Sequence, residues 1–183
     1  NGTAAYEKRG IATSVPQWKI ENCIQCNQCA YVCPHAAIRP FLATEEQAEA
    51  SGLEWKQGLG ETKHLKFRIQ LSPMDCTGCN NCVDVCPAKE KALVMRPLAE
   101  QVEQAKNWDY ITKNIGYAEH VDKTKSVKNL QFSQPLFEFS GACAGCGETP
   151  YIKAITQLFG DRMMVANATG CTSMYRRSPT STP

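Results

Sequence analysis

The chain has 183 residues, of which 20 are basic and 18 acidic, so its net charge is +2. This near balance offers no electrostatic footprint for nucleic acid, whose binding requires a clustered basic face. No apolar run approaches the ~18 residues of a membrane-spanning helix, and the start has no signal-peptide pattern. We therefore expect no nucleic acid and no membrane among its partners.

The eleven cysteines are the most informative total. Because the number is odd, they cannot all pair within the chain, and thiols two or three residues apart would make strained disulfides. Without a secretory signal, we expect reduced cysteines in the cytoplasm that bind metal.

The chain reads as a piece of something longer. It begins at Asn1 and ends in RRSPTSTP, which has no hydrophobic pattern. We expect residues 1–16 to be a linker from a missing upstream domain, and residues 176–183 to be a tail that is not native structure.

Short strands are predicted over 17–21, 36–42, 64–71 and 92–98, each of them next to a cysteine run. Thr44 should start a helix as a capping box with Gln47, and Gly52 should lie just past its end. Residues 52–63 are rich in glycine and polar groups. Together with the helix before them, they predict a surface insertion over 41–63. This insertion lies within a domain that covers 17–115.

The two cysteine runs share one spacing. Residues 23–34 read CIQCNQCAYVCP and residues 76–87 read CTGCNNCVDVCP. This C-x2-C-x2-C-x3-C-P run is typical of bacterial ferredoxins with two 4Fe–4S clusters, in which the fourth cysteine binds the other cluster. The prediction is therefore two crossed ligand sets, one of Cys23, Cys26, Cys29 and Cys86, the other of Cys76, Cys79, Cys82 and Cys33.

Zinc is the alternative, since it also binds C-x2-C pairs. A zinc site gives no reason for the third close cysteine or for the spacing before proline, so we favour clusters. His35 and His64 are not needed as ligands, and we expect His35 to be packed or solvated and His64 to lie at the surface.

The runs also belong to an internal repeat. A shift of 53 residues aligns both runs and matches Asn27 with Asn80 and Val32 with Val85. We expect two halves of strand, cysteine loop, helical turn and strand, packed about a pseudo-twofold axis.

A helix that completes the first domain, then a linker and a second module, are predicted after the repeat. Residues 99–114 should form a helix with Val102, Ala105 and Trp108 on one side, and residues 116–135 should be a linker. A helix should start at Thr149-Pro150 and stop at Gly160. A buried strand over 162–170 should follow, so that residues 136–175 open an α/β domain.

A third group of thiols lies in this module, at Cys143, Cys146 and Cys171. They are one short of a cluster's four ligands. From spacing alone, a zinc site or buried cysteines without a ligand role remain open.

The whole pattern resembles pyruvate:ferredoxin oxidoreductase. The motifs CIQCNQCAYVCPHAAIRP and ACAGCGETPY carry the resemblance, which covers about residues 2–175. It implies an α+β fold: a ferredoxin-like module with two 4Fe–4S clusters, followed by the beginning of an α/β domain that binds thiamine diphosphate. The ending RRSPTSTP departs from the family's glycine-rich continuation.

The resemblance also implies further site residues. Cys143, Cys146 and Cys171 would bind a third 4Fe–4S cluster, whose fourth ligand comes from far downstream. Glu148 would contact thiamine diphosphate, which the full enzyme binds with Mg²⁺, and Cys171 would lie near this cofactor. On sequence alone, the favoured interpretation of Glu148 is a first-turn carboxylate that stabilises the helix dipole.

The implied activity is oxidative decarboxylation of pyruvate with coenzyme A to acetyl-CoA and CO2, with electrons passed to ferredoxin or flavodoxin. A cytoplasmic homodimer is also implied. The chain alone should not turn over pyruvate. The alternatives are another 2-oxoacid:ferredoxin or NADP-linked oxidoreductase and, in a different class, a free two-cluster ferredoxin.

Overall fold

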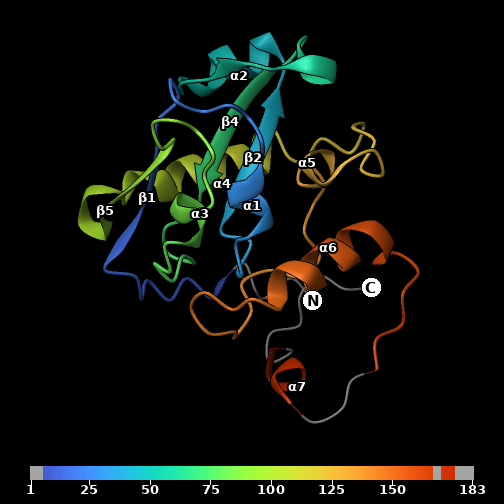
Figure 1. The fold of residues 1–183 in the computed structure, drawn as a ribbon. Coiled ribbons are helices and arrows are strands. Elements are labelled where there is room, and N and C mark those ends of the chain that lie inside the picture. Colours follow the sequence, from blue (N-terminus) through green and yellow to red (C-terminus); the bar gives the residue numbers. More distant parts are fainter. Residues whose placement is uncertain (1–5, 167–169, 176–183) are drawn as a thin grey trace.

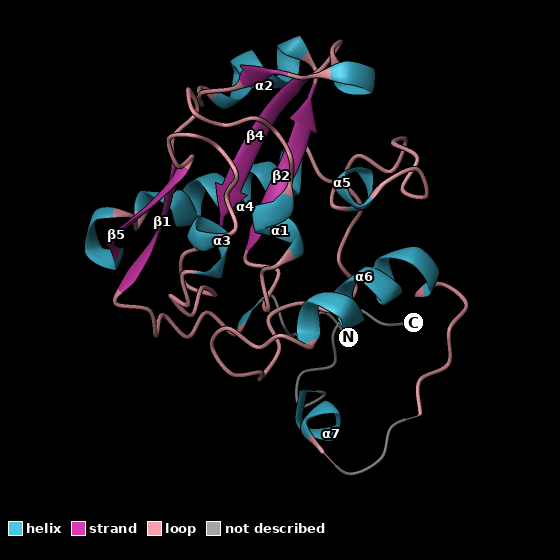
Figure 2. Cartoon of the chain, in the orientation of Figure 1, coloured by secondary structure: helices cyan, strands magenta, loops and turns pink. Residues whose placement is uncertain are grey.

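The computed structural model describes residues 6–166 and 170–175. Two small antiparallel sheets are surrounded by helices (Figures 1 and 2). The strands are β1 (Ser14–Trp18), β2 (Ile38–Ala43), β3 (Lys56–Gln57), β4 (Lys66–Leu71) and β5 (Leu93–Pro97). The helices are α1 (Gln28–Tyr31), α2 (Glu45–Ser51), α3 (Asn81–Asp84), α4 (Glu103–Asn114), α5 (Val127–Leu130), α6 (Thr149–Phe159) and α7 (Cys171–Tyr175), with short 3-10 turns η2 (Gly60–Thr62) and η3 (Leu98–Glu100).

Each sheet joins strands from both cysteine runs. β1 precedes the first run and pairs with β5, which follows the second, so that Trp18 lies opposite Leu93. β2 follows the first run and pairs with β4, which precedes the second, so that Ile38 lies opposite Leu71. This exchange brings α1 and α3 into contact and places the two runs side by side.

An aromatic core holds the sheets together. The Phe67 ring lies 6.2 Å from those of Trp18 and Phe132, both edge-on, and Phe41 lies 6.0 Å from Trp108 of α4. Phe41, Phe67 and Phe132 are fully buried, and burial of each such side chain contributes about 1.5–3 kcal/mol. The core therefore joins both sheets to α4 and to the segment after it.

The predicted helix after Thr44 is confirmed in detail. The Thr44 hydroxyl accepts a hydrogen bond from the Gln47 amide at 3.2 Å, and the Gln47 side chain accepts one from the Thr44 amide at 3.0 Å. Gly52 ends α2 with φ 63°, a left-handed conformation that glycine adopts without a steric cost.

The strand predictions are confirmed, with one shift. The first strand runs over 14–18 instead of 17–21, because Val15 is fully buried and the chain turns toward the first cysteine run after Lys19. The Lys19 amide still donates to the Ala92 carbonyl at 2.8 Å, which extends the pairing by one residue.

The helix predicted over 99–114 starts later, and its predicted face is wrong in part. The η3 turn occupies Leu98–Glu100, and α4 begins only at Glu103. Val102 is therefore outside the helix and 54% exposed, whereas Trp108 and Ile111 are buried.

Two segments predicted as linkers pack against the domain instead. In the first, over 1–16, Ala12 is buried and the Gly10 amide donates to the Met74 carbonyl at 2.8 Å. In the second, over 116–135, Phe132 and Leu130 are buried and α5 is capped by Ser126. Single anchoring side chains on irregular backbone produce no periodic pattern, so this packing could not be predicted from the sequence.

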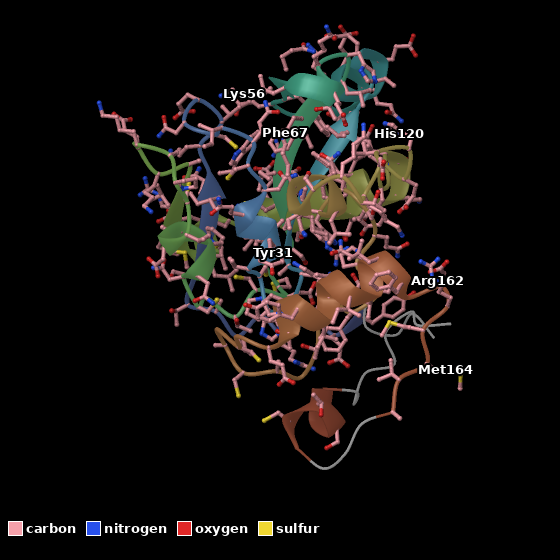
Figure 3. All side chains as sticks on the ribbon, turned by 45° about the vertical axis from the view of Figure 1, so that its right-hand side comes forward. Tyr31, Lys56, Phe67, His120, Arg162 and Met164 are labelled. Atoms are coloured by element: carbon pink, nitrogen blue, oxygen red, sulfur yellow. The ribbon has the colours of Figure 1, made fainter. Side chains whose placement is uncertain are left out.

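The helix predicted from Thr149 to Gly160 is confirmed as α6, with Glu148 instead of Thr149 in the capping position. The buried strand predicted over 162–170 is wrong for residues 162–166, which form no strand. Met164 is 99% exposed and projects away from the helices (Figure 3). A strand needs a paired neighbour, and no described strand lies beside this segment; residues 167–169 and 176–183 lie outside the described residues.

Candidate iron–sulfur cluster sites

Both cysteine runs turn in the same way. Gln25 and Asn27 have φ values of 59° and 60°, and Gly78 and Asn80, at the matching positions of the repeat, have 69° and 70°. Glycine and asparagine enter this left-handed region at low cost. The repeated turn curls each run around its thiols before α1 or α3 begins.

The first void contains thiols from both runs. We call it site A. It has a volume of about 330 Å³, including space open to solvent, and Trp18, Ile69 and Leu93 contribute to its wall. Its thiols are those of Cys23, Cys26, Cys29 and Cys86.

The second void, site B, is the reciprocal arrangement. It has a volume of about 370 Å³, including open space, and Ile38, Leu71 and Met95 contribute to its wall. Its thiols are those of Cys33, Cys76, Cys79 and Cys82. The structure thus gathers the two crossed sets that the sequence predicts, while their role as ligands stays a prediction.

The electrostatics of one thiol in each site, Cys29 and Cys76, follow the same grouping. Burial raises the pKa of Cys29, and the thiols of Cys23, Cys26 and Cys86 raise it further. Burial likewise raises the pKa of Cys76 to about 12, with further contributions from Cys33 and Cys79. A metal ligand must be a thiolate, so metal binding must displace the proton of a thiol whose pKa is raised in this way.

Hydrogen-bond donors face the sulfurs. The amides of Ala37, Gly78 and Ala92 donate to the Sγ atoms of Cys33 at 3.3 Å, Cys76 at 3.4 Å and Cys86 at 3.5 Å. The Trp18 indole nitrogen is buried in the wall of site A and has no acceptor at hydrogen-bonding distance. Burial raises the pKa of the Cys23 thiol, whereas the nearby Trp18 indole N–H lowers this pKa. Such donors suit anionic sulfur in iron–sulfur clusters.

A single zinc ion fits the thiols less well. With Zn–S bonds of ~2.3 Å, a tetrahedral site draws its sulfurs to within ~4 Å of one another. Across residues 6–166 and 170–175, no three His, Cys, Asp or Glu side chains converge closely enough to hold one metal ion. Thiols spread around a void suit a cluster of several irons.

Two lysines that the sequence analysis missed border site A. The Lys56 ammonium donates to the Cys23 carbonyl at 2.9 Å and to two carbonyls just before it. The Lys91 ammonium donates to the Cys86 carbonyl at 2.8 Å. Lys56 comes from the insertion, so no spacing signal in the cysteine runs pointed to it.

The segment before the third cysteine group is fixed on the ferredoxin-like domain. The Phe139 amide donates to the His35 carbonyl at 3.0 Å, and the His35 ring nitrogen Nδ1 lies 3.2 Å from the Ser140 carbonyl. Burial lowers the pKa of His35. His35 is thus packed and His64 exposed, as expected.

A buried arginine holds the same segment. Arg39, 3% exposed, forms an ion pair with Glu138, and its guanidinium lies 4.9 Å from the centre of the Trp108 ring and 5.3 Å from that of Phe139. The sequence gives no sign of this role for Arg39, because its partner is 99 residues away.

The third cysteine group is gathered only in part. Cys143 and Cys146 share one turn, in which the Cys146 amide donates to the Cys143 carbonyl at 3.2 Å. Cys171 begins α7, which lies apart from the sheets (Figure 1). Glu148 is exposed at the N-terminus of α6. A Cβ placed on Gly145 of the turn would lie 3.6 Å from the Cys79 Cβ, so the turn adjoins site B.

The comparisons with known proteins first define a class of domain. Residues 22–90 match the family model described as a 4Fe-4S dicluster domain. This range contains the thiols of sites A and B and the strands β2, β3 and β4. The ferredoxin-like part of the fold prediction is therefore confirmed.

The chain is also similar along its whole length to one kind of enzyme. It is 57% identical to the pyruvate:ferredoxin oxidoreductase of Moorella thermoacetica and 55% identical to the pyruvate-flavodoxin oxidoreductase of Klebsiella pneumoniae. The alignments cover 100% of this chain and 16% of each relative. The pyruvate dehydrogenase [NADP(+)] of Cryptosporidium parvum is 51% identical over 100% of this chain and 10% of its own length. The resemblance drawn from the motifs is thus confirmed, and the chain spans about one sixth of the first relatives.

Proposed function

We propose that this chain is the electron-carrying segment of an enzyme that oxidises pyruvate with coenzyme A to acetyl-CoA and CO2. The observation that carries the proposal is the crossing of the thiols, since each void takes three from one run and one from the other. Similarity along the whole chain to pyruvate oxidoreductases supports the activity.

Sites A and B would each hold one 4Fe–4S cluster, and such clusters supply one-electron chemistry when bound. The eight cysteines would be the ligands, while the amides of Ala37, Gly78 and Ala92 would orient and stabilise the ligating sulfurs. We further propose that the two halves are related by a pseudo-twofold axis. Reciprocal strand pairing and matched left-handed positions support this relation.

Cys143, Cys146 and Cys171 would contribute to a third cluster, with a fourth ligand outside this chain. The contact of Gly145 with Cys79 supports the order third site, site B, site A for electron passage toward ferredoxin or flavodoxin. Glu148, exposed at the start of α6, would contact thiamine diphosphate, which the full enzyme would bind with Mg²⁺.

Residues 136–175 would open the domain that binds thiamine diphosphate. α6 buries Thr149, Lys153, Thr156 and Gln157, yet it exposes an apolar stripe one turn apart, at Tyr151, Ile155 and Phe159. A helix with two faces suited to burial is typical of a helix inside an α/β domain. We also propose, from the resemblance, a cytoplasmic homodimer; gel filtration of the full-length enzyme tests the dimer.

The test is anaerobic reconstitution of the chain with iron and sulfide. We expect about eight irons per chain in the two complete sites and a paramagnetic signal at low temperature after reduction with dithionite. Binding of about one zinc per site without such a signal would refute the proposal. The chain alone should not reduce ferredoxin with pyruvate.

The NADP-linked enzyme is a second candidate for the full protein, favoured by the similarity to the Cryptosporidium parvum enzyme. A flavin domain elsewhere in the full protein would distinguish it. A free two-cluster ferredoxin, the alternative of another class, does not require α6 or the turn at 143–146. Both of these contact the dicluster domain here, which disfavours that alternative.

A further inference from the structure

Lys153 is a buried cation that the proposed function leaves unused. It lies on α6 and is 2% exposed. Its ammonium donates hydrogen bonds to the carbonyl of Ala30 and, at 3.1 Å, to that of Tyr31, at the end of α1. Tyr31 also meets Tyr151 of α6 edge-on, with 6.5 Å between ring centres (Figure 3 labels Tyr31).

The position of Lys153 relates it to both cluster sites. Burial lowers the pKa of Lys153 to about 8, and the thiols of Cys33 and Cys29 act in the opposite direction. Cys33 belongs to site B and Cys29 to site A. The end of α1, to which the ammonium binds, is the stretch of chain between these two cysteines.

Such a cation is costly unless an anion accompanies it. A buried ammonium loses its hydration, and two carbonyls replace only part of it. A cluster with four thiolates carries negative charge at the position of these cysteines. A fixed positive charge close to a cluster favours its reduced form, because reduction adds a negative charge.

We propose that the positive charge of Lys153 raises the reduction potential of the two clusters. The inference rests on the proposed function, because it requires clusters in sites A and B. It assigns α6 a role in electron transfer, because this helix places the Lys153 ammonium at the end of α1, between Cys29 of site A and Cys33 of site B.

The experiment is a potentiometric titration of the reconstituted full chain, followed by electron paramagnetic resonance. Lys153→Met removes the charge and the hydrogen bonds at similar volume, whereas Lys153→Gln removes the charge and keeps a donor. The matched control is Lys123→Met. Lys123 donates to the Gln157 carbonyl at 2.7 Å and thus also holds α6, but four residues further along the helix, near its C-terminal end.

We expect both Lys153 variants to lower the reduced-to-oxidised ratio of the clusters at least threefold at a fixed potential, or ~30 mV at 59 mV per tenfold change. Lys123→Met should leave it unchanged. Loaded Lys153 variants with wild-type potentials would overturn the inference and leave the proposed function intact. An equal shift in Lys123→Met would overturn it too, since seating of α6 would then be the cause.

Two further outcomes separate the inference from its basis. If neither Lys153 variant takes up clusters while Lys123→Met does, Lys153 serves assembly and the tuning role is refuted. If the wild-type chain itself takes up no iron, the proposed function fails.

Discussion

At the scale of single residues, the crossed thiol sets are the most decisive feature. Cys86 lies in the second run but lines site A, and Cys33 lies in the first run but lines site B. A pair of double variants tests this exchange. Cys23→Ser with Cys86→Ser should remove ligands from site A alone, so that about four of eight irons remain.

The comparison variant combines Cys82→Ser with Cys86→Ser. It removes one ligand from each site if the sets are crossed, so both clusters should be impaired. Iron and sulfide analysis after anaerobic reconstitution measures both variants. The opposite result, with a complete cluster only in the second variant, would show that each run binds its own cluster.

Arg39 carries a second prediction at this scale. Its buried guanidinium pairs with Glu138 and lies against the Trp108 ring. Arg39→Met leaves a mostly buried carboxylate without its partner, and breaking a buried pair in this way costs about 3 kcal/mol or more. Urea unfolding of the loaded protein, followed by circular dichroism, should show a clear drop in the midpoint.

The control is the exposed pair of Lys125 and Glu61, 2.7 Å apart. Lys125→Met should leave the midpoint unchanged, because exposed ion pairs contribute little. A loss in Arg39→Met no larger than this control would contradict the structural role of the buried pair.

At the scale of elements, the features that could be predicted from the sequence are those that depend on neighbouring residues. The capping box at Thr44, the strand over 64–71 and the helix up to Gly160 depend on neighbouring residues, and all three are confirmed. Packing over long distances was not predictable. Phe132 in the supposed linker and Lys56 in the insertion act on partners far along the chain. The cysteine spacing succeeded at long range because the crossing is a property of the motif itself.

The seating of α6 gives a prediction for an element. Gln157 is 3% exposed, and its side-chain amide donates to the carbonyls of Leu130 at 3.2 Å and Ser133 at 2.9 Å. Gln157→Leu removes the donor to the Ser133 carbonyl, at about 1–3 kcal/mol for an unsatisfied group, whereas the Leu130 carbonyl keeps a hydrogen bond from the Ser133 amide at 3.1 Å. Amide hydrogen exchange in α6 should accelerate accordingly.

Ile155→Ala on the same helix is the control, since Ile155 is 47% exposed and its truncation leaves the contacts with 130–133 in place. Exchange in α6 should then stay near the wild-type rate. Equal exchange rates in Gln157→Leu and Ile155→Ala would show that other contacts, such as those of Lys153, hold the helix.

At the scale of the whole molecule, the two voids lie where a small protein would otherwise place its core. Short strands surround them, and apolar core residues such as Leu71 and Leu93 line only part of their walls. The fold must therefore be stabilised by what fills the voids as well as by its apolar contacts. No helix of the described part of the chain is long and apolar enough to cross a membrane.

Removal of iron and sulfide tests this dependence directly. Most of the strand pairing links segments that enter or leave the cysteine runs. Ligation and folding are coupled in such small metal-binding domains, so the chain without iron should lose most of its far-ultraviolet circular dichroism and regain it on anaerobic reconstitution. α2 carries its own capping box, but an isolated helix of this length is not stable in water and should unfold with the rest. A near-native spectrum of fully iron-free protein would mean that the aromatic core around Phe67 alone suffices for the fold.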